Sequence, residues 1–279
     1  MKATMNTGKN KKPLKKAQPG APMKATHDAS YIPAGYKPWI ILAILVVTFI
    51  AYAPSLQNDL LKTWDDQAYV TQNDLITNLS PAGIVRIFKE DRGLYANYHP
   101  LTTLSLAFNH AISDKSPLGY HLTNLFIHLL NTLLVFLFIL MLPGKRIFAA
   151  AVVALLFGIH PMHVESVAWI SERKDVLYTL FFLASLISYL YYLQRNNHLK
   201  WYLLALILFV CSMLSKAMAA PLPFVLFLID YLTGRKWNVR VFVEKIPFFL
   251  ISIGLGMLAM KIQAEGNATS SGLFSITSR

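Results

Sequence analysis

Charged residues are scarce in this chain. Only 14% of its 279 residues are Asp, Glu, Lys or Arg, whereas 55% are hydrophobic. A soluble globular domain carries about 25% charged residues, so most of the surface of the folded chain has to face something other than water. Long apolar runs recur along the sequence, and they indicate that the chain is embedded in lipid.

Cysteine is nearly absent as well. The single cysteine, Cys211, lies inside an apolar run and has no partner in the chain. A framework of intrachain disulfides is therefore excluded, and Cys211 is interpreted as a small core residue. The sequence also lacks a nucleotide-binding glycine pattern and an internal repeat.

Positive charge is in excess, with a formal net charge of +12, and much of it lies at the N-terminus. Residues 1–37 are rich in Lys, Pro, Gly and Ala and show no apolar periodicity, which predicts a disordered basic cytoplasmic tail. Such a tail sets the topology and can contact anionic lipid. No recognised DNA- or RNA-binding motif accompanies these lysines, so we expect no nucleic-acid partner.

The apolar runs predict an all-α polytopic membrane protein with about seven transmembrane helices. An upright crossing takes about 20 residues, and several runs are shorter, so flanking residues have to extend them. The segment 217–223 is either a tight turn between two spans or the tip of a re-entrant hairpin. The predicted spans are 39–56, 121–142, 147–160, 176–193, 201–216, 218–232 and 246–260.

The distribution of charge predicts the orientation of these spans. With a cytoplasmic N-terminus, the inner side holds 16 of the 26 Lys and Arg residues and 3 of the 14 acidic residues. Because inner loops are enriched in Lys and Arg, we expect the N-terminus inside and the C-terminus outside. Residues 57–120 then form a long structured outer loop. Within it, Ser80 and Pro81 begin an amphipathic helix, and 101–112 lies along the membrane surface.

Three candidate sites lie on the predicted outer side of the membrane, and His99 among them opens the surface-lying stretch 101–112. Asp65 and Asp66 follow the first span, where one of two adjacent carboxylates has a raised pKa and can accept a proton from a hydroxyl; a solvated acidic turn is the alternative. His99 either binds a phosphate or carboxylate or simply starts a helix. Lys216 either binds a phosphate or extends its ammonium to the membrane surface.

The richest motif is the predicted outer loop over residues 160–175. Its histidines and carboxylates can bind a metal, but their spacing differs from the H-E-x-x-H pattern of zinc proteases, so we expect no metal. Its two adjacent basic residues suit a lipid-linked phosphate, or they anchor the helix at the membrane surface. The candidate residues are His160, His163, Glu165, Arg173, Lys174 and Asp175.

Polar side chains also follow one face of the second predicted span. His121, Asn124, His128 and Asn131 recur at spacings of three and four residues, which places them on the same side of a helix. Polar groups in a span are costly unless they face a partner. They either form hydrogen bonds between helices or line a cavity, and a cavity suits a transporter or flippase.

Four motifs give the chain a family resemblance. They are Trp64-Asp65-Asp66, Tyr98-His99-Pro100-Leu101, the run from His160-Pro161 to Arg173-Lys174-Asp175, and Ser215-Lys216-Ala217. At these residues the sequence resembles the membrane half of the transmembrane and tetratricopeptide-repeat proteins. These are related to protein O-mannosyltransferases within the type-C glycosyltransferase superfamily. The resemblance covers about residues 38–265, and 266–279 is expected to be the truncated start of a following segment.

The resemblance implies a transferase on the non-cytoplasmic face. It would move a mannose-like sugar, with inversion, from a polyprenyl-phosphate carrier to a hydroxyl of a protein or glycan, without a cofactor. Asp65 would be the general base, with Asp66 as second choice or as an orienting partner. His99, Arg173, Lys174 and Lys216 would hold the carrier phosphate, although many relatives have arginine in place of His99. The supporting residues would be His128, His160, His163, Glu165 and Asp175.

Two other functions remain open from the sequence. The membrane half can be a scaffold for a downstream repeat domain, or the chain can be a transporter or flippase for a lipid-linked substrate. For location, we expect an integral membrane protein in contact with membrane lipids, and a bacterial inner membrane is favoured over the endoplasmic reticulum.

Overall fold

The computed structural model describes residues 38–62, 64–91, 97–144, 146–195 and 197–273, with side chains up to 265. The described residues form α-helices joined by short 3-10 or π-helical turns, with no β-strand among them. The predicted basic tail, 1–37, lies outside the described residues, as does the end of the predicted last segment, 274–279.

Each predicted apolar segment is a helix in the structure. Apolar side chains without charges favour helices in lipid because a helix satisfies its own backbone hydrogen bonds. The helices are α1 (Pro38–Tyr52), α4 (Pro117–Met141), α5 (Ile147–Ile159), α7 (Arg173–Gln194), α8 (Leu199–Ser215), α9 (Leu222–Leu232) and α11 (Ile246–Leu273). The shorter elements are η1 (Ala53–Gln57), η2 (Gln67–Thr71), η3 (Asp74–Thr77), α2 (Pro81–Glu90), α3 (Pro100–Ser113), η4 (Pro161–His163), α6 (Val164–Ala168), η5 (Ile170–Glu172), η6 (Ala217–Ala219) and α10 (Val239–Val243).

The number of full crossings is smaller than the expected seven. Within the described residues, four helical segments are long and apolar enough to span a membrane, and a fifth is available if α5 and the following Pro161–Ala168, bent by 49°, form one span. The difference arises at α8 and α9, which are apolar but shorter. The four segments are Pro38–Gln57, Pro117–Met141, Ile170–Gln194 and Val239–Glu265.

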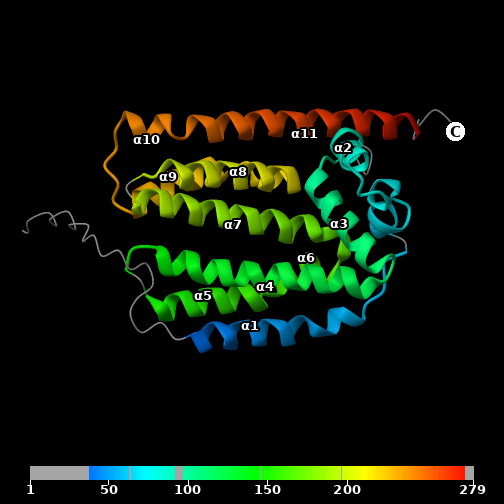
Figure 1. Ribbon diagram of the computed structural model, residues 1–279, viewed down its shortest axis with the longest axis horizontal. Helices are drawn as coiled ribbons and strands as arrows, with labels where there is room; N and C mark the ends of the chain where they lie inside the picture. The colour runs from blue at the N-terminus through cyan, green and yellow to red at the C-terminus, as the bar shows by residue number, and fades with distance from the viewer. Residues whose placement is uncertain (1–37, 63, 92–96, 145, 196, 274–279) are drawn as a thin grey trace, which may run out of the picture. The chain divides into compact units, whose positions relative to one another are not determined.

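The long helices run side by side, and their connections gather at two ends (Figure 1). One end carries α2, α3, the turns around 160–172 and the turn after α8; we name it the outer end, following the predicted orientation. The other carries the connections near 144, 196 and 234 and is named the inner end. Lys216 contacts Asp175 at the start of α7, whereas Asp230 contacts Tyr189 near its end. Thus α9 returns antiparallel to α8 after a tight turn.

A buried ionic cluster holds the inner end together. Lys245 is fully buried and donates hydrogen bonds to Asp230 and to the hydroxyl of Tyr189. Arg235 lies 2.7 Å from Glu244. Because each charge has an opposite charge as a neighbour, the cluster compensates for its removal from water and ties α7, α9 and α11 to one another.

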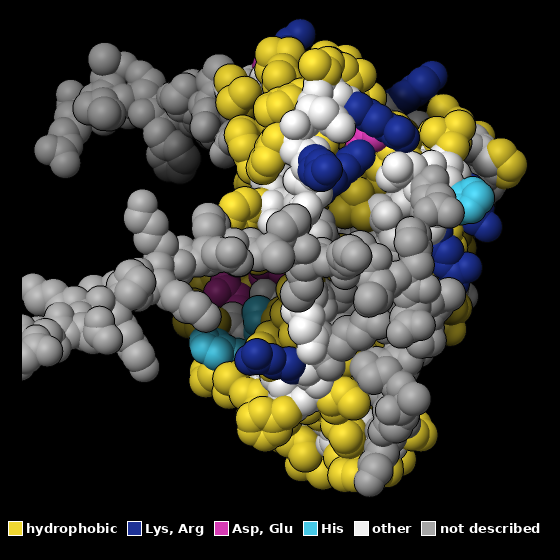
Figure 2. All heavy atoms as spheres, turned by 90° about the vertical axis from the view of Figure 1, so that its left-hand side faces the viewer, with side chains coloured by type: hydrophobic (Ala, Val, Ile, Leu, Met, Phe, Trp, Pro, Cys, Tyr) yellow, Lys and Arg dark blue, Asp and Glu magenta, His cyan; other side chains and the backbone are white. Residues whose placement is uncertain are grey.

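The surface of the inner end is basic. Figure 2 looks onto this end and shows Lys and Arg side chains spread among apolar ones. The exposed basic residues include Arg146, Arg195, Lys200, Lys236 and Arg240. A basic surface of this kind suits the cytoplasmic side of a membrane; the side itself stays a prediction.

The outer loop folds onto the opposite end of the bundle. The side chain of Ser80 accepts a hydrogen bond from the backbone N–H of Gly83 at 3.2 Å, which confirms the predicted start of α2. The apolar stretch 101–112 forms the helix α3, which lies across the outer ends of the long helices (Figure 1). Its Thr102 donates to the carbonyl of Ser215 at 3.0 Å and so fixes α3 to the end of α8.

The polar face of α4 forms hydrogen bonds between helices. The amide of Asn124 donates to the carbonyl of Trp169 at 3.2 Å, and that of Asn131 donates to the carbonyl of Val176 at 2.8 Å. The Nε2 of His128 lies 2.9 Å from the carbonyl of Gly158. Of the two alternatives, helix-to-helix bonding is confirmed for these three side chains, and they do not favour a transport cavity.

Candidate functional site

Two lysines and two carboxylates meet at the outer end. The Nζ of Lys174 lies 2.7 Å from one oxygen of Glu172, and the Nζ of Lys216 lies 3.6 Å from the other. Lys216 also pairs with Asp175. The turn η5 and the first turn of α7 supply three of these residues, and the end of α8 supplies Lys216. We name this group, Glu172, Lys174, Asp175 and Lys216, the lysine cluster.

Mutual neutralisation fixes the charge state of Lys216. Burial lowers its pKa, but the hydrogen bond and charge of Asp175, together with the charge of Glu172, raise it by more. The pKa of Lys216 therefore lies above its ordinary value, and Lys216 is an ammonium at neutral pH.

His99 adjoins the lysine cluster. It is buried at the start of α3, and burial, followed by the charges of Lys174 and Lys216, lowers its pKa to about 3. His99 is therefore neutral at pH 7. Its Nδ1 is buried without a hydrogen-bond partner among the described residues, so the ring retains bonding capacity beside two cations.

Tyr69 connects the acidic pair to the lysine cluster. The Nζ of Lys174 lies 5.1 Å from the centroid of the Tyr69 ring. The pKa of Tyr69 is raised, chiefly by burial and then by the charges of Asp91 and Asp65. Asp65, which is partly buried, is thus within electrostatic reach of Tyr69.

The second acid of the pair has a different environment. Asp66 is buried and accepts hydrogen bonds from the backbone N–H groups of Leu61 and Ser171, each at 3.0 Å, and from the Ser171 hydroxyl. These contacts hold the outer loop against the turn before α7. The structure thus places Asp66 between the outer loop and the turn before α7, and the roles of both acids stay predictions.

The structure does not bring Arg173 into the lysine cluster. Its guanidinium is completely buried and donates to the side chain of Asn124 at 2.7 Å, to the carbonyl of Tyr120 at 2.8 Å, and to the side chain of Asn109. The N–H groups of the guanidinium are thus hydrogen-bonded to neutral oxygens on several sides. Arg173 joins α3, α4 and α7, and the expected phosphate contact of this residue stays a prediction.

The two histidines of the loop, His160 and His163, lie next to each other, with ring centroids 6.1 Å apart, and the charge of Asp175 reaches His163. His160 is exposed and caps η4, where its Nδ1 accepts from the backbone N–H of Met162 at 3.2 Å. The ring of His163 lies 5.6 Å from that of His128. Glu165 is exposed. Among the described residues, no group of three or more His, Cys, Asp or Glu side chains is arranged to hold a metal ion.

Three residues of the site were not among the sequence candidates: Tyr69, Asp91 and Glu172. Asp91 is buried, and its Oδ2 accepts from the backbone N–H of His99 at 3.1 Å. Burial raises the pKa of Asp91 to about 6, although its hydrogen bonds with Thr103 and His99 act in the opposite direction. Glu172 stands next to candidate residues in the motif, so its role was accessible from the sequence. No local sequence pattern indicates that Asp91 belongs to the site, because its position depends on how the outer loop folds.

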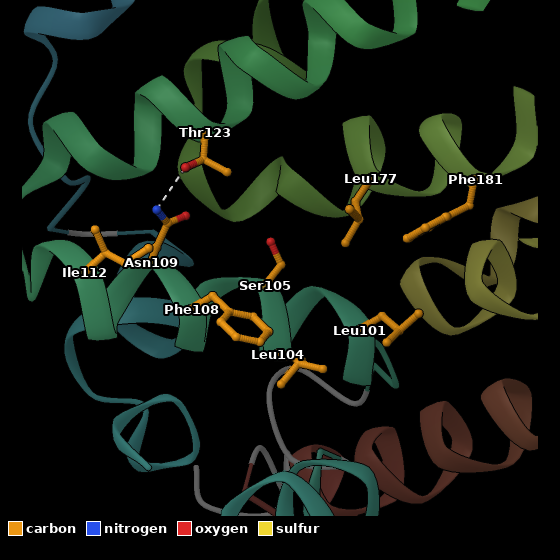
Figure 3. A pocket seen from close by; sticks show the side chains of 9 residues that line it. All are labelled: Leu101, Leu104, Ser105, Phe108, Asn109, Ile112, Thr123, Leu177 and Phe181. Carbon is orange, nitrogen blue, oxygen red and sulfur yellow. Dashed lines mark hydrogen bonds between the residues drawn. The ribbon is translucent and has the colours of Figure 1, made fainter. Parts of the chain in front are cut away.

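An apolar cavity of about 320 Å³ opens beside the site, between α3, α4 and α7. Figure 3 shows Leu101, Leu104, Phe108 and Leu177 among its lining residues, with Ser105, Asn109 and Thr123 as its polar ones. The Nδ2 of Asn109 donates to the hydroxyl of Thr123 at 2.8 Å. Leu101 and Leu177 follow His99 and Asp175 by two residues, and Asn109 also contacts Arg173. The cavity therefore lies at the same end of the bundle as the lysine cluster.

The fold and the site define an all-α polytopic membrane protein with a charged site at one end of its helices. A Caenorhabditis elegans protein O-mannosyl-transferase is 28% identical over 240 residues, covering 80% of this chain and 32% of that protein. The human protein O-mannosyl-transferase TMTC4 is 28% identical over 235 residues, covering 75% of this chain and 31% of the human protein. The human TMTC2 is 39% identical over 130 residues, covering 44% of this chain and 15% of that protein.

These relatives confirm the resemblance to the membrane half of the transmembrane and tetratricopeptide-repeat proteins. The chain spans about a third of the length of the first two relatives. No protein-family model matches the chain, and no solved structure matches it. The relatives named here come from animals, and the preference for a bacterial membrane stays a prediction.

Proposed function

We propose that the chain is the membrane part of a glycosyltransferase that moves a mannose-like sugar from a polyprenyl-phosphate carrier to a hydroxyl of a protein. The names of the relatives, protein O-mannosyl-transferases, support the class of reaction and of acceptor. The observation that carries the proposal is the convergence of Lys174, Lys216, His99 and Tyr69, with Asp65 nearby, at one end of the helices.

In this proposal, the lysine cluster binds the phosphate of the carrier. Lys174 and Lys216 are ammoniums that can pair with phosphate oxygens, and Glu172 between them keeps them a short distance apart. His99, neutral and with Nδ1 unoccupied, accepts a hydrogen bond from a hydroxyl of the substrate. The apolar cavity beside α3 receives the first isoprene units of the lipid.

The transfer itself is a displacement at the anomeric carbon. The acceptor oxygen forms a bond to that carbon while the bond from carbon to phosphate oxygen breaks, so the configuration inverts. Asp65 takes the proton from the acceptor hydroxyl, and the polyprenyl phosphate leaves with the electron pair. Lys174 and Lys216 stabilise the charge that develops on the leaving phosphate.

The test is a transfer assay on the full-length protein in lipid vesicles. A short-chain polyprenyl-phosphate mannose is the donor, and a Ser- and Thr-containing peptide is the acceptor. We expect Lys216→Met to raise the donor KM and lower kcat/KM by about 100-fold, equivalent to about 2.7 kcal/mol of transition-state stabilisation. Lys89→Met, which removes an exposed lysine of α2, is the matched control and leaves both constants unchanged.

Two results contradict the proposal. If the unmodified full-length protein transfers no mannose to any Ser- or Thr-containing peptide, the proposed reaction is wrong. If Lys216→Met and Lys89→Met behave alike while transfer proceeds, the lysine cluster is not the phosphate site.

A further inference from the structure

A second cavity, of about 240 Å³, lies in the outer loop beside η3 and α2. Asn73 shapes its rim: its Oδ1 accepts from the backbone N–H of Leu75 at 3.0 Å, and its Nδ2 donates to the carbonyl of Tyr69 at 3.2 Å. The cavity is smaller than the roughly 300–1,000 Å³ of sites for drug-sized ligands. Its size therefore suits one or two amino-acid side chains rather than a lipid-linked sugar.

The lining of this cavity is polar and carries net negative charge. Asp74 is exposed at the rim, and Glu90 pairs with Arg86 at 2.6 Å, so the charge of Arg86 is already compensated. Asp91 adds a buried carboxylate. Such a lining favours ligands that donate hydrogen bonds or carry positive charge, and it repels phosphate.

Asp91 also links the cavity to the lysine cluster. It lines the cavity, and its Oδ2 accepts from the backbone N–H of His99. The charge of Asp91 is felt by Tyr69, whose ring contacts Lys174. His99, whose backbone N–H makes this contact, also has a buried Nδ1 without a hydrogen-bond partner within the described part of the chain. A group held in the cavity is therefore connected, through Asp91 and His99, to the site where the carrier phosphate is expected.

We propose that this cavity is the acceptor subsite, and that it selects hydroxyl-bearing peptide segments flanked by Lys or Arg over those flanked by Asp or Glu. The inference rests on the proposed function and adds the class of acceptor to it. The apolar cavity takes the lipid of the donor, whereas this polar one takes a side chain next to the reacting hydroxyl. Asp74 at the rim pairs with the basic side chain.

The experiment compares two fluorescent peptides with the full-length protein in nanodiscs. Both contain the same Ser and Thr residues, one flanked by Arg and the other by Glu. Binding is measured by fluorescence anisotropy, and transfer is measured separately with the short-chain polyprenyl-phosphate mannose. We expect the Arg-flanked peptide to bind at least about 5-fold more tightly, which is about 1 kcal/mol.

Two lysine substitutions in the same loop separate the cavity from general surface charge. Asp74→Lys should bring the ratio of the two affinities to one or below and leave the donor KM unchanged. Asp59→Lys introduces the same change of charge at another exposed position of the outer loop, outside the cavity, and should leave the ratio near its original value. Asp74→Asn, a smaller change at an exposed position, should reduce the ratio to an intermediate value.

The inference is wrong if the protein binds neither peptide saturably, if it binds both equally, or if Asp74→Lys and Asp59→Lys change the ratio by the same amount. Selective binding with no transfer contradicts the proposed function and, with it, the acceptor role of the cavity. Transfer without selectivity contradicts the cavity assignment alone.

Discussion

Arg173 and Lys174 are consecutive in the chain, yet their charged groups have opposite surroundings. The guanidinium of Arg173 is completely buried among neutral oxygens of Asn124, Asn109 and Tyr120. The ammonium of Lys174 lies in the lysine cluster, 2.7 Å from Glu172. One basic residue therefore holds helices together, and the other faces the candidate site.

Substitution of these two residues should separate stability from activity. Arg173→Met leaves three buried acceptors without their donor, so we expect a loss of about 3 kcal/mol or more and a markedly lower thermal midpoint. Lys174→Met should cost less stability, because Glu172 keeps Lys216 as a neighbour, but should strongly reduce transfer. Thermal unfolding in detergent and the transfer assay measure the two effects. An Arg173→Met protein with an unchanged midpoint and no transfer would instead place the guanidinium at the ligand.

Asp65 and Asp66 offer a second pair of neighbours with different expected outcomes. Asp66→Asn weakens the bonds to Leu61 and Ser171 and introduces amide donors there, so we expect a loss of about 1–3 kcal/mol. Asp65→Asn should change the free energy of unfolding by no more than about 0.5 kcal/mol. It should lower kcat by about 100-fold or more. The same two assays apply. Normal transfer by well-folded Asp65→Asn protein would remove Asp65 from the role of base.

Asp91 predicts a dependence of stability on pH. Burial raises its pKa from 3.8 to about 6, so the folded state favours the neutral carboxyl. The stability contributed by this proton is fully present below about pH 4 and is lost as the pH rises through about 6. Asp91→Asn removes the cost of ionisation, so it should stabilise the protein at pH 7.5 by up to about 3 kcal/mol and confer little advantage at pH 4. Thermal midpoints across this range measure the difference, and a constant difference at all pH values would contradict the assignment.

Gly158 lies at a close approach of α5 to α1 and α4. A methyl group added there would lie 2.3 Å from the hydroxyl oxygen of Thr48 and 3.1 Å from a methyl carbon of Thr132. Gly158→Ala should therefore destabilise the protein by about 1–3 kcal/mol. Adding Thr48→Ala should recover part of the loss, since it removes the nearer atom. If the double variant is as unstable as the sum of the two single variants, the contact does not limit the packing.

The sequence predicted the helices and the gathering of several candidate residues at one end of the bundle, because both depend on local patterns. Apolar runs gave the long helices, and Ser80 with Pro81 gave the start of α2. The lysine cluster could be predicted in part, because Lys174, Asp175 and Lys216 flank predicted spans. The roles of Arg173 and Lys174 could not be distinguished from the sequence. The two residues are neighbours on one helix, and which of them points into the protein depends on how the helix is rotated against its neighbours. The buried position of Asp91 and the contact between Tyr69 and Lys174 depend on the fold of the outer loop.

The buried pair of Asp230 and Lys245 has a consequence for the assembly of the protein in its membrane. Lys245 would lose its ion-pair partner without Asp230 and be left in a nonpolar medium, which is costly, whereas Asp230 without Lys245 would keep Arg235 as an ion-pair partner, 3.4 Å away. We therefore expect α9 to stay in a protected, water-accessible place until α11 has been synthesised and the two ions have met. The order in which these helices enter the bilayer then depends on the formation of this ion pair, and we expect their integration to be a joint event rather than two independent ones.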